Sequence, residues 1–197
     1  MTDFSTVEKN LRDRGYKVCS FGSGKEAADY LAAELKGKSV GIGGSMTIKE
    51  LGLYDRLSEG STVYWHWETG PETRADAASA QVYLTSVNGL AETGEIINID
   101  GAGNRVASTL YGHEKVYLVA GENKIAKDYD SALWRARNIA SPLNARRFGL
   151  KTPCAVGELR CYDCKSPERI CRGLSVLWSK PMTGEFEIIL IGEKLGY

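Results

Sequence analysis

Short apolar runs alternate with amphipathic stretches along most of the chain. The apolar runs predict buried strands beginning at Ser39 and spanning 62–66, 82–85 and 115–120. Helix-like stretches lie between the later runs, at 71–80 and 104–110. Because strands that alternate with helices usually form parallel sheets, the pattern predicts an α/β fold. Its sheet is expected to be mostly parallel and covered by helices on both faces.

Two capping-box patterns predict helices near the beginning of the chain. Ser5 with Glu8, and Ser23 with Glu26, have the spacing at which a hydroxyl and a carboxylate satisfy the first amides of a helix. We therefore expect N-terminal helices within about residues 1–37.

The last third of the chain predicts a longer helix and then a less regular region. Asp128 is a candidate N-cap, and the helix that follows carries Trp134 on an aromatic stripe typical of a core face, before Pro142 interrupts it. A Cys-rich segment and a β-hairpin are expected at about 150–197. Since the chain shows no internal repeat, we expect one domain over 1–197.

Composition excludes several classes of partner. Lys plus Arg and Asp plus Glu both number 25, so the formal net charge is zero and no uniform field attracts nucleic acid or a membrane surface. The hydrophobic share of 43% fits a globular protein. Charged residues interrupt the first twenty positions and the apolar runs are too short to span a bilayer, so we expect a cytoplasmic location.

A glycine-rich turn at 41–47 joins a predicted strand to a helix that begins near Ser45. Glycines let the main chain approach a ligand closely, and a helix start presents unpaired amides to an anion. Thr47 adds a second hydroxyl donor. The turn matches neither a P-loop nor the dinucleotide fingerprint. An anion-binding turn and a tight connection without a ligand are therefore alternatives.

Polar side chains crowd around turn glycines at 85–105. Asp100 directly follows an apolar strand, and ligands of open sheets bind at this end of the strands. Asp100 is a candidate general base, and Arg105 could hold a carboxylate by two parallel hydrogen bonds. The alternative is turn chemistry, in which Asn88 and Asp100 satisfy the main chain beside them.

His66 ends a predicted strand between two tryptophans. A packed core histidine and a catalytic histidine both fit this position.

Four of the five cysteines fall between 154 and 171, and only Cys19 lies elsewhere. The central pair is separated by two residues, which suits two ligands of one metal ion, and the outer pair could complete a four-thiolate shell. Thiolates suit both zinc and iron–sulfur clusters, so the spacing does not choose between them. Unmetallated thiols are the alternative. The candidate ligands are Cys154, Cys161, Cys164 and Cys171.

Several separated stretches together resemble the LUD (lactate-utilisation) domain family. They are 40–52, 84–106, 119–125 and 138–144, in addition to the cysteine segment. The resemblance implies a fold similar to sugar-phosphate isomerases and coenzyme A transferases, with an anionic ligand at the first glycine turn. It places Gly43, Gly44, Ser45, Met46 and Thr47 on that turn, Asn88, Asp100, Gly101, Asn104 and Arg105 on facing loops, and Asn123 and Lys124 after a later strand.

The resemblance also implies a function. Members of the family are associated with the oxidation of L-lactate to pyruvate, usually within multi-protein systems that contain iron–sulfur clusters. We therefore expect an oxidoreductase component that binds a small hydroxy or keto acid, or a phosphorylated relative, and works with an iron–sulfur redox partner protein. A metal-binding electron-transfer or assembly subunit without its own turnover is the alternative. A homo-oligomer is compatible with either hypothesis.

Overall fold

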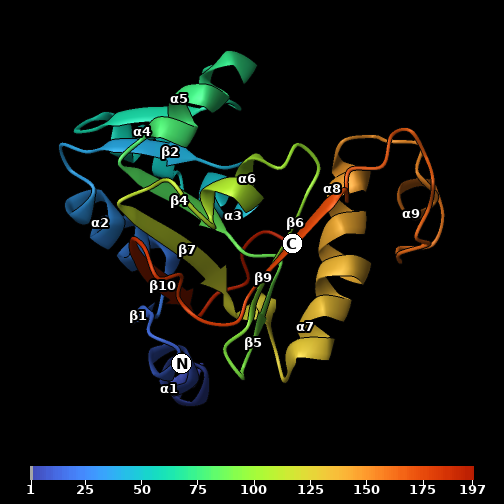
Figure 1. Ribbon diagram of the computed structural model, residues 1–197, viewed down its shortest axis with the longest axis horizontal. Helices are drawn as coiled ribbons and strands as arrows, with labels where there is room; N and C mark the ends of the chain where they lie inside the picture. Colours follow the sequence, from blue (N-terminus) through green and yellow to red (C-terminus); the bar gives the residue numbers. More distant parts are fainter. Residues whose placement is uncertain (1) are drawn as a thin grey trace.

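Six parallel strands form the main sheet of the computed structural model, which describes residues 2–197 (Figure 1). Their order is β1 (Lys17–Phe21), β10 (Glu185–Ile191), β7 (Lys115–Gly121), β4 (Val82–Ser86), β2 (Ser39–Ile42) and β3 (Thr62–Trp65). Every neighbouring pair is parallel. The predicted α/β fold with a parallel sheet is confirmed.

Helices cover both faces of this sheet. One face packs against α2 (Gly24–Glu34), α3 (Met46–Glu50) and α4 (Leu53–Ser58), and the other against α1 (Ser5–Asp13), α5 (Arg74–Ser79) and α6 (Asn104–Ser108). Alternate residues of each strand enter the two cores. Tyr117, for example, is buried with α2 and α4, whereas Leu118 is buried with α1. The Ser23–Glu26 capping box is present at the start of α2, as predicted.

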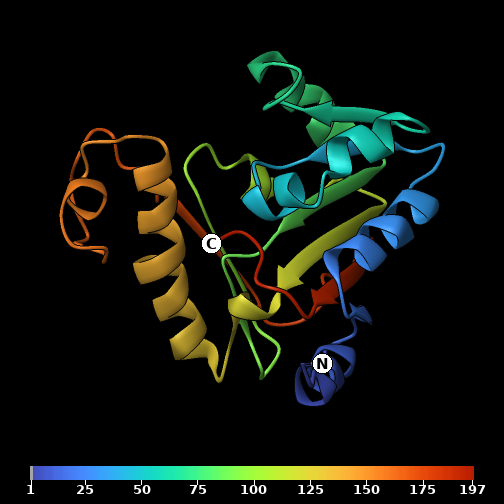
Figure 2. The ribbon, with the colours of Figure 1, turned by 180° about the vertical axis from the view of Figure 1, so that it is seen from behind.

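A second sheet lies against the α1 face of the main sheet (Figure 2). Its strands are β8 (Ile125–Ala126), β5 (Gly89–Ala91), β6 (Ile96–Asp100) and β9 (Gly173–Leu177). Leu90 and Ile96 point into the core shared with the main sheet, while Ala91 and Ile97 pack against helix α7 (Tyr129–Arg135). The carboxyl end of β6 therefore lies between the main sheet and the helical layer that contains α7.

The predicted C-terminal hairpin is wrong. β9 pairs antiparallel with β6 in the second sheet, whereas β10 lies between β1 and β7 in the main sheet. Residues 186–191 of β10 are buried without interruption, as expected for a central parallel strand that is covered on both faces. Two strands that are neighbours in sequence thus separate, because the more apolar one is buried in the middle of the main sheet.

The long helix continues past the expected interruption. After α7 comes a π-helical turn, Ala136–Ala140, and then α8 (Ser141–Arg147), so that Pro142 lies inside a continuous helical rod. The wider turn accommodates proline, which donates no amide hydrogen bond, and Ser141 Oγ donates to the Ala136 carbonyl oxygen at 2.9 Å. Trp134 is 59% exposed, so its expected place in the core is also wrong.

The remaining short helices flank loops. They are the 3-10 turns Pro71–Thr73 and Glu122–Lys124, and the helix α9 (Pro153–Val156). Within residues 2–197, no helix combines the length and the apolar character needed to cross a membrane.

Candidate functional site

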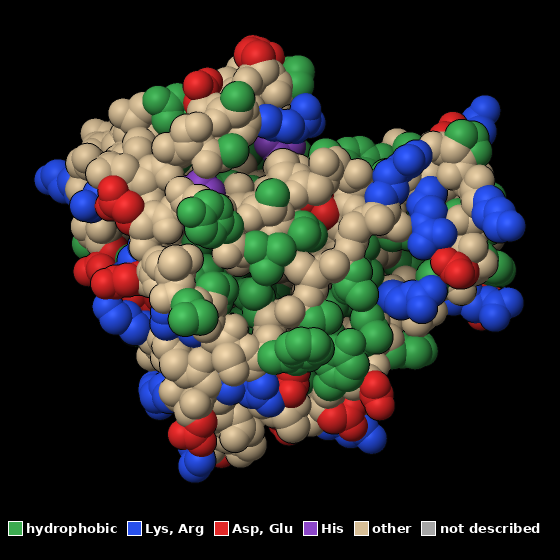
Figure 3. Space-filling model, in the orientation of Figure 1, with side chains coloured by type: hydrophobic (Ala, Val, Ile, Leu, Met, Phe, Trp, Pro, Cys, Tyr) green, Lys and Arg blue, Asp and Glu red, His purple; other side chains and the backbone are tan. Residues whose placement is uncertain are grey.

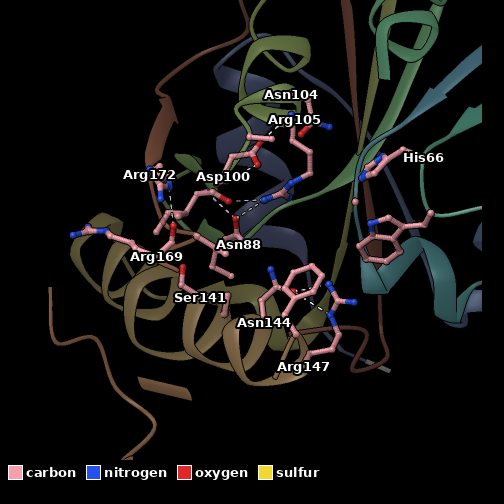
Figure 4. Close-up of a pocket in the computed structure, with 18 of the residues that line it drawn as sticks. His66, Asn88, Asp100, Asn104, Arg105, Ser141, Asn144, Arg147, Arg169 and Arg172 are labelled. Carbon is pink, nitrogen blue, oxygen red and sulfur yellow. Dashed lines mark hydrogen bonds between the residues drawn. The ribbon is translucent and has the colours of Figure 1, made fainter. Parts of the chain in front are cut away.

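A cavity of about 280 Å³ lies beyond the carboxyl ends of β2, β3 and β6, opposite helix α8 (Figure 4). The loop after β2 contributes Gly44, and the loop after β3 contributes His66 and Trp67. Helix α8 and the stretch 169–172 form the opposite wall. The lining residues that the sequence predicted are Gly44, Asn88, Asp100, Gly101, Asn104 and Arg105.

Arginine is the dominant charged residue of the lining. The arginines are Arg74, Arg105, Arg147, Arg169 and Arg172, and Asp100 is the one carboxylate among the lining residues of the described chain. Figure 3 shows that Lys and Arg side chains also gather on the surface over α8 and the segment that follows it. The cavity is therefore strongly positive within a chain whose formal net charge is zero.

The Asp100 carboxylate is occupied by main-chain amides. It accepts hydrogen bonds from Gly101 N at 2.7 Å, Arg105 N at 2.7 Å and Val106 N at 3.2 Å. These bonds hold the loop before α6 and satisfy the first amides of that helix. The observed geometry gives Asp100 a positioning role, and its proposed role as a general base stays a prediction.

The Arg105 guanidinium is fixed by acceptors beneath it. Its Nη2 donates to the Ile99 carbonyl oxygen at 2.6 Å and to Asn88 Oδ1 at 3.2 Å. The same Asn88 oxygen accepts the main-chain amide of Ile99 at 2.8 Å. Asn98 Oδ1 accepts Arg105 Nη1 at 3.4 Å. Because these contacts orient the guanidinium before a ligand arrives, little side-chain entropy is lost on binding.

The glycine turn lies directly against these groups. A Cβ atom on Gly43 would come within 2.6 Å of Arg105 Cγ and 2.7 Å of the Tyr83 hydroxyl oxygen, and one on Gly44 would come within 3.0 Å of the Trp67 ring. Glycine is required here by close packing. The turn and the 100–105 loop, predicted separately from sequence, are therefore neighbours.

The other predicted residues of the turn point elsewhere. Ser45 Oγ accepts the Ile48 amide at 3.3 Å as the N-cap of α3, and Thr47 Oγ1 donates to the Leu195 carbonyl oxygen at 3.3 Å. Ser45, Met46 and Thr47 are therefore not among the residues that line the cavity.

Asn123 and Lys124 are also separate from the cavity, because the end of the chain covers them. Asn123 Oδ1 accepts the Leu195 amide at 3.0 Å, and Lys124 Nζ donates to the Tyr197 main-chain oxygen at 2.6 Å. Lys124 is only 4% exposed. Burial, together with the charges of Arg135 and Arg105, lowers the pKa of Lys124 to about 7.

His66 faces Asp100 and Asn88 across the cavity (Figure 4). Within residues 2–197 its buried Nδ1 has no hydrogen-bond partner. Burial, followed by the charge of Arg74, lowers the pKa of His66 and favours the neutral imidazole. From sequence, a packed core residue and a catalytic residue were both compatible with His66. The structure places its side chain on the wall of the cavity.

Arg147 is the clearest site residue that sequence reasoning missed. Its guanidinium lies 4.7 Å from the Trp67 ring centroid and 4.0 Å from that of Phe148, and Asn144 Oδ1 accepts two of its hydrogen bonds. The only sequence signal was the resemblance at 138–144, which ends at Asn144.

The four clustered cysteines line a second, smaller cavity of about 20 Å³. Arg169 and Ile170 line both cavities. Across the described residues, no group of three or more His, Cys, Asp or Glu side chains is arranged to hold a metal ion. Cys19 lies apart, on β1, with its sulfur 3.9 Å from the Tyr30 hydroxyl oxygen. The structure thus gathers the four predicted ligands around one space without forming a coordination shell.

Two solved structures were compared with this chain. A DUF162 family protein from Deinococcus radiodurans is 17% identical and has a TM-score of 0.59, with 98% of this chain and 100% of that chain covered. This identity supports the fold alone. The eIF2B beta structure from Chaetomium thermophilum is 12% identical with a TM-score of 0.33, over 65% of this chain and 44% of that chain. No curated protein matches the chain.

The family itself is established by sequence. The LUD domain family model matches residues 5–191, which include every strand of both sheets and all the residues that line the large cavity. The chain belongs to the LUD domain family.

Proposed function

We propose that the chain binds a small anionic metabolite in the arginine-lined cavity and thereby contributes to L-lactate utilisation. The ligand class is a hydroxy or keto acid, or a phosphorylated relative. The observation that carries the proposal is the charge of the lining, where five arginines face one carboxylate. Arg105 and Arg169 are half-buried and the other three are exposed, so together they give the cavity a concentrated positive potential that attracts a small anion.

The arrangement of donors suits oxyanions. Arg105 donates to the Ile99 carbonyl oxygen, and the Arg147 guanidinium lies 4.7 Å from the Trp67 ring centroid. Planar guanidinium groups bind carboxylate and phosphate oxygens through paired hydrogen bonds, which makes arginine more selective than lysine for such ligands. A volume of about 280 Å³ corresponds to roughly nine water molecules, enough for a three-carbon acid with ordered water or for a larger phosphorylated ligand.

His66 is the group best suited to handle a proton in this cavity. Its imidazole lines the cavity and is favoured in the neutral form, which can accept a hydroxyl proton, whereas the oxygens of Asp100 already accept three amides. Oxidation of L-lactate to pyruvate releases two electrons and two protons. An electron acceptor is therefore required, and an iron–sulfur redox partner protein is proposed for this role.

Calorimetric titration with matched ligands tests the proposal. L-lactate, pyruvate and a sugar phosphate are compared with L-lactamide, which has the shape of L-lactate without its charge. We expect saturable binding of at least one anion and none of the amide. Equal affinity for L-lactate and L-lactamide, or binding of neither the acids nor the phosphate, would contradict recognition by charge. An L-lactate oxidation assay with an artificial electron acceptor then separates an enzyme from a binding protein.

The second candidate function, a metal-binding electron-transfer or assembly subunit, is supported by a different observation. All four clustered cysteines line one small cavity beside the proposed anion site.

A further inference from the structure

The segment between α8 and β9 buries almost no side chain and is held mainly by hydrogen bonds, such as those that Arg146 donates to the carbonyl oxygens of Ala155 and Gly157. Across residues 148–172 the regular structure is limited to α9, and Thr152 is the one buried residue. Long stretches with so little secondary structure are usually functional or disordered, because they bury too little apolar surface to offset their conformational entropy. Its cysteines are the side chains that could add a stronger cross-link to these hydrogen bonds.

The four thiols reach the same space from three parts of the segment. Cys154 lies on α9, Cys161 and Cys164 lie on the loop that follows, and Cys171 precedes β9. All four are partly exposed, and their shared cavity of about 20 Å³ has room for about one water-sized sphere. A ligand bound at this point would cross-link the whole segment.

The loop between the central cysteines has the shape of a chelating turn. Asp163 has a φ of 44°, the one positive φ among the described residues other than glycine. This conformation directs the Asp163 amide toward Cys161 Sγ at 3.4 Å. Main-chain amides commonly donate to metal-bound sulfur, so this turn is compatible with a ligand position at Cys161. A non-glycine residue in this region is strained, and such strain is common at ligand sites.

Positive charge surrounds the thiols. Arg137 Nη2 lies 3.6 Å from Cys161 Sγ, and Arg169 also lines the thiol cavity. The one carboxylate beside them, Asp163, has a side chain that is 72% exposed. Asp163 Oδ1 lies 3.8 Å from Arg137 Nη2 and 3.1 Å from Arg169 Nη1, so the three side chains together carry one positive charge. They would offset part of the net charge of minus two that four thiolates and one divalent cation leave.

We propose that Cys154, Cys161, Cys164 and Cys171 hold a thiophilic metal centre that fixes the 148–172 segment. The thiols are not arranged as a shell in the metal-free chain, so binding requires their side chains to turn into the shared cavity. Zinc and an iron–sulfur cluster share this thiolate chemistry, and metal analysis identifies which one is held.

The centre would also order one wall of the anion cavity. Arg169 donates to the carbonyl oxygens of Cys164 at 2.9 Å and Cys171 at 2.8 Å, and the same side chain lines the anion cavity. Arg172 is held in turn by the carbonyl oxygen of Arg169 at 2.8 Å. The metal centre stands on these contacts and does not depend on the identity of the anion.

Metal content of three forms of the protein tests the proposal. The wild type, the double variant C161S/C164S and the matched control C19S are purified without oxygen, then analysed for zinc, iron and acid-labile sulfide per chain. We expect about one centre per chain in the wild type and in C19S, and at least a roughly ten-fold weaker affinity in the double variant. Zinc alone identifies a single ion, and iron with sulfide identifies a cluster.

Cobalt titration provides a readout that is independent of activity and of anion binding. Cobalt(II) bound by thiolates gives an intense charge-transfer band, which is expected for the wild type and C19S and lost in C161S/C164S. Circular dichroism of each form checks the fold. Equal metal content and an equal cobalt band in the double variant and C19S would overturn the proposal. So would a wild-type protein that holds no metal after reconstitution with zinc and with iron and sulfide.

Discussion

Arg147 offers the sharpest test of the anion cavity. It contributes a positive charge to the cavity wall, and its side-chain hydrogen bonds are local, so its replacement should not disturb the fold. Its guanidinium lies over Trp67 and Phe148, and its hydrogen bonds go to Asn144, one helical turn away. R147M keeps most of the side-chain volume and the apolar contact with the rings. We therefore expect the variant to fold normally, with a loss of unfolding free energy of about 1 kcal/mol or less from the cation–π contact.

The expected effect on anion binding is larger. A hydrogen bond from a charged group to an anion contributes about 1.5–3 kcal/mol. The Trp67 and Phe148 rings lie against the Arg147 guanidinium, and burial lowers its pKa. The loss corresponds to a rise in Kd of about 10- to 150-fold. The matched control is R56M, which removes an exposed arginine paired with Asp29 on the far side of the main sheet.

Calorimetry at two salt concentrations distinguishes a built site from general attraction. Removing one positive charge from the whole molecule changes a long-range field equally in both variants, and salt screens that effect. We expect R147M to lose affinity at both salt concentrations, while R56M stays within about two-fold of the wild type. If both variants lost affinity equally, or if neither did, the assignment of the cavity would be wrong.

Three further predictions concern stability, and each is checked by denaturant unfolding. G41A should lower the unfolding free energy by several kcal/mol, because the new Cβ would lie 2.1 Å from a main-chain oxygen of α5. E187Q should lower the unfolding free energy by about 3–5 kcal/mol, because Glu187 is 3% exposed and accepts a hydrogen bond from Lys115 Nζ at 2.7 Å. Burial acts to raise the pKa of Glu187, but the contact with Lys115 outweighs burial and the pKa is lowered. The stabilisation is therefore present above about pH 4.5 and is lost on acidification in the wild type, whereas E187Q should not show this loss. Because the pKa of Lys124 is lowered to about 7, the unfolded chain binds more protons between about pH 7 and 10.5, and wild-type stability should rise with pH by up to about 1.4 kcal/mol per unit. The variant K124M should lose this rise and the exposed control K127M should keep it.

The main sheet was predictable because each strand carries its own signal. Compact apolar runs begin at Ser39 and span 62–65 and 82–86. The structure buries most of β2 and all of β4, while β3 at the edge of the sheet is only partly buried. The pairing of β9 and β10 was not predictable by the same means. A pattern of apolar residues predicts that a strand is present, but it does not identify the strand with which it will pair.

The site was only partly predictable for a related reason. Asp100 and Arg105 stand out in sequence because turn glycines surround them, and the structure brings Gly44 to the same wall. Arg147 lies on a helix among other polar residues, where sequence alone cannot distinguish a cavity wall from solvent. Lys124 follows a strand as expected, but the last residues of the described chain cover it, and this contact has no local signature.

Arg169 links the two proposals, because the same side chain lines the thiol cavity and the anion cavity. Any coupling between metal and anion must be reciprocal, since each ligand changes the affinity for the other by the same factor. Arg105 and Arg147 have hydrogen-bond partners outside the 148–172 segment, although Arg147 also stacks on Phe148 at its start. Both should therefore stay close to their positions without metal. Removal of metal should therefore weaken anion binding without abolishing it. Complete loss would mean that the anion binds mainly to the wall that contains Arg169.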